Sequence, residues 1–289
     1  MNDYVILTDN CADLPQSYLD EKGISCAFLS YSMNGKQYGP ENRMDDHEFY
    51  EAMRKGSMPT TAQVNPEQVK ELMIPFLQKE LDILYLSFSS GLSGSCASAE
   101  AAAAELREEY PERKIMVVDT LAASLGQGLL VHYACLRKEA GDSLEENAKW
   151  VEDHRLNLVH LFTVDDLFHL HRGGRVSKTT AIVGSILSIK PVLHVDDEGH
   201  LIAIGKVRGR RKSILELARL MDEKIGSYKD SCDTIFISHG DCLEDARLLE
   251  EKIREKYPLK TVLINYVNPT IGSHSGPGTL ALFFLGDHR

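Results

Sequence analysis

The sequence predicts an α/β protein whose first half is a parallel sheet with helices on its faces. Three observations support this: short apolar runs alternate with helical patterns in the first half, polar loops follow three of these runs, and the second half changes to strands joined by a tight turn. With 289 residues, 43% of them hydrophobic, the chain is long enough for two modest domains. We expect an N-terminal α/β domain over residues 1–160 and a smaller α+β domain over 161–289, unless the last strand returns to the first domain.

The first half is expected to alternate strands and helices along the chain. Strands are predicted at residues 4–8, 24–33, 81–87 and 114–118, and helices at 16–22, 46–55, 66–80, 96–110, 120–140 and 143–156. Proline in the first turn favours the helix at 66–80, and a run of alanines favours the helix at 96–110. Because ligands bind beyond the carboxyl ends of parallel strands, the polar loops at 8–13, 87–95 and 119–128 are expected to meet on one rim.

The second half is expected to contain strands with helices to one side. Strands are predicted at residues 159–164, 190–196, 200–207, 234–238 and 261–267, and helices at 165–171, 178–187, 213–225 and 242–257. Asp197-Glu-Gly199, between two of these strands, is typical of a hairpin turn. Strands paired by a tight turn indicate an α+β domain.

Composition argues against several classes of protein. A net charge of −11 makes nucleic acid or an anionic membrane an unexpected partner, and no apolar run approaches the roughly 18 residues that span a bilayer. The N-terminus leads into a strand without a signal-peptide pattern, and the six scattered cysteines are typical of reduced thiols, so we expect a cytoplasmic protein. The sequence has no phosphate loop, dinucleotide fingerprint or metal-ligand spacing, and no cofactor of its own is expected.

The stretch Ser89-Ser-Gly-Leu-Ser-Gly-Ser95 lies between a buried strand and an alanine-rich helix. A helix N-terminus offers unpaired N–H groups and a partial positive charge, and serine hydroxyls add donors, so this loop suits a small anionic group. Its glycines allow a ligand to approach the backbone. The plainer interpretation is that Ser93 or Ser95 caps the helix, and both interpretations stay open here.

The same loop is similar to half of the nucleophile elbow of serine hydrolases, Gly-x-Ser-x-Gly, but Ser95 replaces its last glycine. The alternative function is therefore a hydrolase or acyltransferase that uses Ser93 and His274. His274 lies in Ile271-Gly-Ser-His-Ser-Gly-Pro-Gly278, which we expect to be a glycine-rich turn after a strand. The ring of His274 either donates to a carboxylate or phosphate or simply hydrogen-bonds a carbonyl.

Two basic motifs occur in this acidic chain, Arg172-Gly-Gly-Arg-Val-Ser177 and Lys206-Val-Arg-Gly-Arg-Arg-Lys212. Each either holds an anion or forms a solvated face that balances nearby acids. The residues themselves favour neither interpretation.

Eight motifs occur in one order along nearly the whole chain: Thr8-Asp-Asn-Cys-Ala-Asp-Leu-Pro15, Thr60-Thr-Ala-Gln63, Ser89-Ser-Gly-Leu-Ser-Gly94, Val118-Asp-Thr120, Arg172-Gly-Gly-Arg-Val-Ser177, Ile189-Lys-Pro191, Lys206-Val-Arg208 and Ile271-Gly-x-His-x-Gly-Pro-Gly278. Together they resemble the DegV family. The resemblance implies a long-chain fatty acid, palmitate- or oleate-like, between an α/β N-terminal and a smaller C-terminal domain.

The resemblance also implies a function. The protein would be a lipid-binding carrier and not an enzyme: the binding subunit of a bacterial fatty acid kinase in phospholipid synthesis. It would present the carboxylate to a separate ATP-dependent kinase subunit for acyl-phosphate formation, with transient contact with a membrane. A binder of another small carboxylate or lipid is a further alternative.

Roles are implied by position in the same way. The ligand-binding residues implied are Thr61, Ser93, Gly94, Ser273 and His274, and the candidates for handling the phosphoryl group are Arg208 and Arg175. The family's Thr-Ser-Gln-Pro reads Thr61-Ala-Gln-Val64 here, which puts any hydrogen bond from position 62 in doubt. Apolar residues at 161–168, 181–187 and 283–284 are expected to line a tunnel for the acyl chain.

Overall fold

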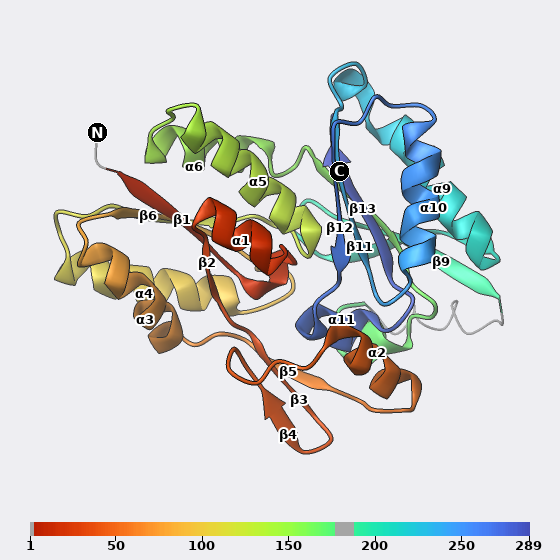
Figure 1. Ribbon diagram of the computed structural model, residues 1–289, viewed down its shortest axis with the longest axis horizontal. Helices are drawn as coiled ribbons and strands as arrows, with labels where there is room; N and C mark the ends of the chain where they lie inside the picture. The colour runs from red at the N-terminus through yellow and green to blue at the C-terminus, as the bar shows by residue number, and fades with distance from the viewer. Residues whose placement is uncertain (1–2, 177–187) are drawn as a thin grey trace.

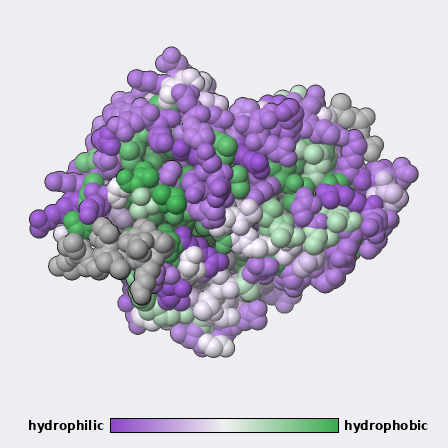
Figure 2. Space-filling model, turned by 180° about the vertical axis from the view of Figure 1, so that it is seen from behind, coloured by the Kyte–Doolittle hydropathy of each residue, from purple (hydrophilic) through white to green (hydrophobic). Residues whose placement is uncertain are grey.

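The computed structural model describes residues 3–176 and 188–289. Two halves lie side by side, each with its own sheet and helices, and a third, small sheet lies at the bottom of the view in Figure 1. Figure 2 shows that the opposite face is mainly hydrophilic, with apolar patches on both halves. The α/β class predicted from the sequence is confirmed.

The first half contains a parallel four-stranded sheet in the order β2–β1–β6–β7. Its strands are β1 (Tyr4–Asp9), β2 (Ser25–Ala27), β6 (Asp82–Ser87) and β7 (Ile115–Asp119). One face packs against α3 (Pro66–Leu77) and α4 (Ser95–Glu109), and the other against α1 (Gln16–Lys22), α5 (Leu125–Glu139) and α6 (Leu144–His154). Every residue of β6 is buried because helices cover both faces.

A small antiparallel sheet, in the order β4–β3–β5, follows β2 in the chain. It consists of β3 (Ser30–Met33), β4 (Lys36–Tyr38) and β5 (Thr60–Ala62), and α2 (Asp46–Arg54) packs on it through buried aromatic side chains. The prediction of one strand over 24–33 is wrong. The Asn10 side chain accepts from the N–H of Leu29 and donates to its carbonyl, and these bonds separate β2 from β3.

The second half contains a six-stranded sheet in the order β10–β9–β8–β13–β11–β12, in which β11 and β12 pair in parallel and the other neighbours antiparallel. Its strands are β8 (Leu158–Thr163), β9 (Ile189–Val195), β10 (Leu201–Arg208), β11 (Thr234–His239), β12 (Thr261–Tyr266) and β13 (Leu280–Leu285). The predicted hairpin is confirmed as β9–β10.

Helices cover the second sheet unevenly. The helices α9 (Arg210–Lys224) and α10 (Leu243–Arg254) pack on one face, and α5 of the first half packs on the other. The short helices α7 (Phe168–Arg172) and α11 (Pro269–Ser275) pack against each other, and α11 also contacts α2 and β3. The helix predicted at 178–187 lies outside the described residues.

Strand β13 lies between β8 and β11 of the second sheet, and not beside a strand of the first sheet, which the alternative of a returning last strand would have required. A boundary between residues 160 and 161 would cut β8, which belongs wholly to the second sheet. A division of the chain before Leu158 fits the sheet topology. That the two parts are separate domains stays a prediction.

Two further predictions differ from the structure. The helix predicted at 120–140 begins only at Leu125, because side chains of Asp119 and Thr120 bond the N–H groups of residues 121 and 122. The expected turn at 271–278 is largely helix α11, which Asn268 caps by accepting from the N–H groups of the first helical turn.

The two halves meet closely at Gly126 of α5, where an added Cβ would collide with the His160 ring and with Phe283. We expect Gly126→Ala to lower the free energy of unfolding by about 1–3 kcal/mol, because overpacking displaces buried side chains. Urea denaturation measures this. The control is Gly205→Ala, where the nearest atom to the added Cβ is 4.0 Å away, and an equal loss there would contradict the packing explanation.

Candidate ligand-binding site

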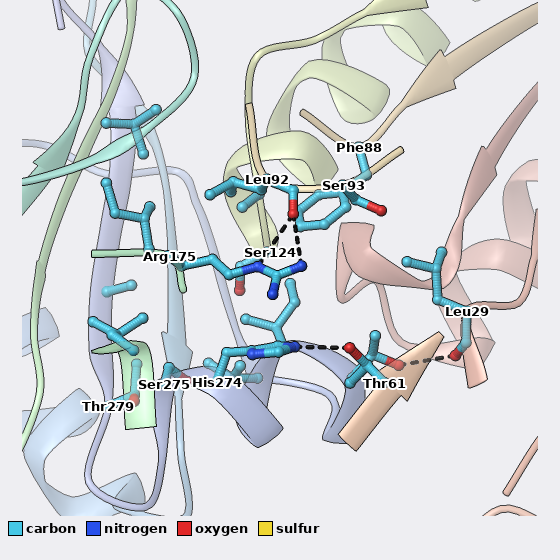
Figure 3. A pocket seen from close by; sticks show the side chains of 18 of the residues that line it. Leu29, Thr61, Phe88, Leu92, Ser93, Ser124, Arg175, His274, Ser275 and Thr279 are labelled. Atoms are coloured by element: carbon cyan, nitrogen blue, oxygen red, sulfur yellow. Dashed lines mark hydrogen bonds between the residues drawn. The ribbon is translucent and has the colours of Figure 1, made fainter. Parts of the chain in front are cut away.

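A cavity of about 230 Å³ lies between the two halves. This is far more than the roughly 10–15 Å³ that holds one water molecule, so the cavity is of ligand size. Its first-half lining includes Leu29, Thr61, Phe88, Leu92, Ser93, Gly94 and Ser124, and its second-half lining includes Phe162, Leu170, Arg175, Val195, Leu201, Thr270, His274, Ser275, Ala281 and Phe283. Figure 3 shows polar side chains from both halves close together at one end.

A hydrogen bond between Thr61 and His274 joins the two halves across the cavity. The Thr61 Oγ lies 2.7 Å from the His274 Nε2, and the residues come from β5 and α11 respectively. The His274 Nδ1 is buried and has no hydrogen-bond partner among the described residues. If Nε2 carries the proton and donates to the Thr61 oxygen, the threonine hydroxyl is free to donate to an anion in the cavity.

The environment keeps the His274 ring neutral. Burial, and then the positive charges of Arg175 and Arg172, lower the pKa of His274 to about 4. The imidazole is therefore neutral at neutral pH, and Arg175 is the charged donor that lines this end of the cavity.

The Arg-Gly-Gly-Arg motif closes this end of the cavity. Arg172 donates to the carbonyls of Pro59 and Ser273, each at 3.0 Å, and so ties α11 to the segment before β5. Arg175 donates to the carbonyl of Leu92 at 3.1 Å and to that of Gly173. A Cβ at Gly173 would collide with the His274 ring, so this glycine allows α7 to approach α11.

Ser93 lies at the start of α4 and has a structural partner. Its Oγ lies 2.9 Å from the Ser95 Oγ and accepts from the Ser95 N–H at 3.2 Å. The N-cap of α4 is Gly94, and no side chain caps this helix, so the interpretation that Ser93 or Ser95 is its cap is wrong. Ser93 and Gly94 both line the cavity. The positive end of the α4 dipole lies at this loop.

The three polar loops of the first half meet on one rim, as predicted. The Phe88 N–H donates to Asp9 at 2.8 Å, the Gln127 amide donates to Thr8 and Asp9, and the Ser90 N–H donates to Asp119. These bonds hold the loops together where the parallel strands end.

Two predicted site residues do not reach the cavity. Ser273 is fully buried in α11 and donates to the Pro269 carbonyl at 2.6 Å, and Arg208 is exposed at the end of β10. Of the predicted tunnel residues, Phe162 and Phe283 line the cavity, whereas Leu161 and Phe284 face α9 and α10. The predicted tunnel residues at 181–187 lie outside the described residues.

Several lining residues were not predicted. Ser124, Thr270 and Ser275 all line the cavity, and Arg172 orders its wall. Ser124 and Thr270 lie where helices α5 and α11 begin, so a search for serine and threonine at strand-to-helix junctions could have found them.

The alternative of a Ser93–His274 catalytic pair requires a hydrogen bond between these two side chains. Among the described residues, Ser93 bonds Ser95 and His274 bonds Thr61, and no hydrogen bond joins Ser93 to His274. Among residues 3–176 and 188–289, no cluster of histidine, cysteine or acidic residues is placed to hold a metal ion. In the same ranges, no helix has the length and apolar character needed to cross a membrane.

The lowered pKa of His274 makes stability depend on pH. Its neutral form contributes stability that is present above pH 6.5 and is lost as the pH falls from 6.5 towards 4. We expect NMR to show His274 titrating near pH 4. We also expect His274→Gln to lose less unfolding free energy than the wild type as the pH falls from 6.5 towards 4, a difference of at most about 1.4 kcal/mol per pH unit for one group. Titration of His274 near pH 6.5 would contradict this account.

Comparisons with known proteins identify the family. The DegV family model, described as an uncharacterised protein family, matches residues 3–287. A DegV domain-containing protein of Clostridium perfringens is 46% identical over 291 residues, which cover 100% of this chain and 99% of that protein. Two solved structures are similar over 99% of this chain and 100% of their own chains. One is a DegV family protein from Thermus thermophilus, described for its fatty acid binding, with a TM-score of 0.87 and 31% identity. The other is DegV of Bacillus subtilis, described as a fatty acid binding protein, with a TM-score of 0.85 and 28% identity. The chain therefore belongs to the DegV family.

Proposed function

We propose that the protein binds one long-chain fatty acid in the cavity between its halves and carries it to a separate kinase. The observation that carries this proposal is the composition of the cavity: hydroxyl donors and an arginine at one end, and apolar side chains from the second sheet over the rest. The fatty acid binding described for the relatives from Thermus thermophilus and Bacillus subtilis supports the same ligand class.

The carboxylate would bind between Thr61 and Ser93. The Thr61 hydroxyl, oriented by His274, and the Ser93 hydroxyl would donate to it, and the α4 dipole would add favourable charge. Gly94 allows the Gln63 side chain to pack against this loop, because an added Cβ would collide with it. Burying a carboxylate costs several kcal/mol, and each hydrogen bond to it contributes about 1.5–3 kcal/mol, so these donors mainly orient the ligand.

The acyl tail would supply most of the affinity. Phe162, Val195, Leu201, Ala281 and Phe283 line the cavity from the face of the second sheet that packs towards the first half. Each buried CH₂ group contributes about 0.8 kcal/mol, so a chain of palmitate or oleate length would offset the cost of its ordering.

Extraction of the purified protein with organic solvent, followed by mass spectrometry, tests the proposed ligand. We expect about one long-chain fatty acid per chain, or binding of added palmitate or oleate by a delipidated sample. A stoichiometric lipid of another class would favour the alternative of a different carboxylate or lipid ligand. Failure to find or bind any fatty acid would refute the proposal.

Ser93→Ala should weaken palmitate binding by roughly ten- to hundred-fold, because it removes one hydrogen bond to a charged group. Calorimetric or fluorescence titration measures the dissociation constant. The matched control is Ser90→Ala, in the same loop but exposed and outside the cavity lining. Equal affinities for the wild type and Ser93→Ala would exclude the assigned role, and labelling of Ser93 by a fluorophosphonate would instead favour the hydrolase alternative.

We further infer that an ATP-dependent kinase subunit phosphorylates the bound carboxylate, since the sequence contains no phosphate loop. Arg208 is exposed on the edge strand β10, outside the cavity, which suits a contact with a partner or with its phosphoryl group. Arg175, at the head-group end, would be the second candidate for the phosphoryl group.

Arg208→Ala should leave palmitate affinity unchanged and lower the rate of acyl-phosphate formation with the kinase subunit at least tenfold. Arg211→Ala, which removes the same charge from a nearby exposed position, is the control. The role of Arg208 would be wrong if its variant lost palmitate binding, or if both variants slowed phosphorylation equally.

A further inference from the structure

Two carboxylates are buried in one short turn at the end of β1. Asp9 ends this strand and Asp13 follows the single 3-10 turn η1 (Asn10–Ala12). The exposed fractions of Asp9 and Asp13 are 0% and 4%. Among the described residues, neither forms a salt bridge, so their hydrogen bonds alone compensate for burial.

The two carboxylates hold different parts of the cavity wall. Asp9 accepts from the N–H of Phe88 at 2.8 Å, and Phe88 lines the cavity and begins the loop that carries Ser93. Its other oxygen accepts from the Cys11 N–H at 3.1 Å and from the Gln127 amide at 3.2 Å. Asp9 is therefore bonded entirely to the first half.

Asp13 reaches across to the second half. Its Oδ1 accepts from the backbone N–H of Asn268 at 3.1 Å and also from the Asn268 side-chain amide. Asn268 is the N-cap of α11, and its own oxygen accepts from the N–H groups of Thr270 and Ile271. Asp13 thereby holds the cap of the helix that carries His274. Its Oδ2 bonds the hydroxyl of Ser124, another lining residue.

We infer that Asp9 and Asp13 are positioning residues of the head-group site, Asp9 for the Ser93 loop and Asp13 for α11 and His274. This inference rests on the proposed fatty acid function for its binding readout only. Burial raises the pKa of Asp9 to about 6 and that of Asp13 to about 8. Ionising these buried carboxyl groups therefore costs the folded state free energy, which fits residues that position the site and do not serve stability.

Because the groups bonded to Asp9 and Asp13 differ, replacement by asparagine should lose a hydrogen bond at position 9 and keep the hydrogen bonds at position 13. All partners of Asp9 are N–H groups, so Asp9→Asn places an NH₂ against an N–H and loses a bond. Asp13 can be replaced by asparagine without loss, because its Oδ1 still accepts from Asn268 and the new NH₂ donates to the Ser124 oxygen. Asp13→Ala removes both contacts.

The test combines NMR of the ligand-free protein with palmitate titration. We expect Asp13→Ala to shift the His274 ring signals and to weaken palmitate binding at least tenfold, and Asp13→Asn to restore both to within about threefold of the wild type. Asp9→Asn should weaken binding at least tenfold and shift the amide signals of residues 88–93, while the His274 ring signals stay in place.

Two further variants make the outcome decisive. Asn268→Ser keeps a good helix cap and the backbone N–H that bonds Asp13, but it removes the side-chain amide that donates to Asp13 and to the Asn10 carbonyl. This loosening of the Asp13 contact should shift the His274 signals even if Asp13→Ala does not fold. Asp82→Asn is the control for general destabilisation, because Asp82 is a buried carboxylate at the first residue of β6, at the other end of this strand from Phe88. Unmoved His274 signals in folded Asp13→Ala or Asn268→Ser, or an equal affinity loss in Asp82→Asn, would overturn the inference. If no form of the protein binds palmitate, the proposed function fails, while the ligand-free signals still test the positioning.

Discussion

The hydrogen bond between Thr61 and His274 is the contact on which the proposed head-group site depends. It joins β5 of the small sheet to α11 of the second half across the cavity. The bond can form only if β5 and α11 are both held in place. Gly173 allows α7 to approach the ring, Arg172 ties α11 to the segment before β5, and Asn268 caps α11. Since β5 and α11 belong to different halves, any relative movement of the halves would change the position of the Thr61 hydroxyl.

The electrostatics of this site are compatible with the proposed binding of an anion by an acidic chain. The chain has a net charge of −11, yet the head-group end presents hydroxyl donors, the N-terminus of α4 and Arg175. The neutral His274 ring fits this arrangement, because a protonated ring beside two arginines would be unfavourable in a buried place. For the proposed ligand, local donors would outweigh the overall charge, and the apolar wall of the second sheet would add binding energy without charge.

Sequence patterns predicted the parallel sheet, the β9–β10 hairpin and the loops around Ser93 because these features follow from local residue spacing. The break between β2 and β3 was missed because it depends on the Asn10 side chain, which is distant in sequence from Leu29. Similarly, the position of β13 is fixed by its pairing with β8 and β11, which lie 40 residues or more away in the sequence. The capped helix α11 was not predicted because the glycines at 272, 276 and 278 are typical of a turn. The Ser93 loop and His274 were candidates from the residues themselves, whereas Thr61 was a candidate only through the family resemblance. Arg172 contacts the carbonyls of Pro59 and Ser273, which are distant in sequence and so could not be predicted from local spacing.

The proposed ligand would have its carboxylate between Thr61 and Ser93 and its tail against the second sheet. A crystal structure of the protein with palmitate would show both directly. We expect carboxylate oxygens within hydrogen-bond distance of both hydroxyls, the Thr61–His274 bond intact, and the acyl chain beside Phe162 and Phe283. A carboxylate bound elsewhere, or an acyl chain outside the cavity, would contradict this proposal.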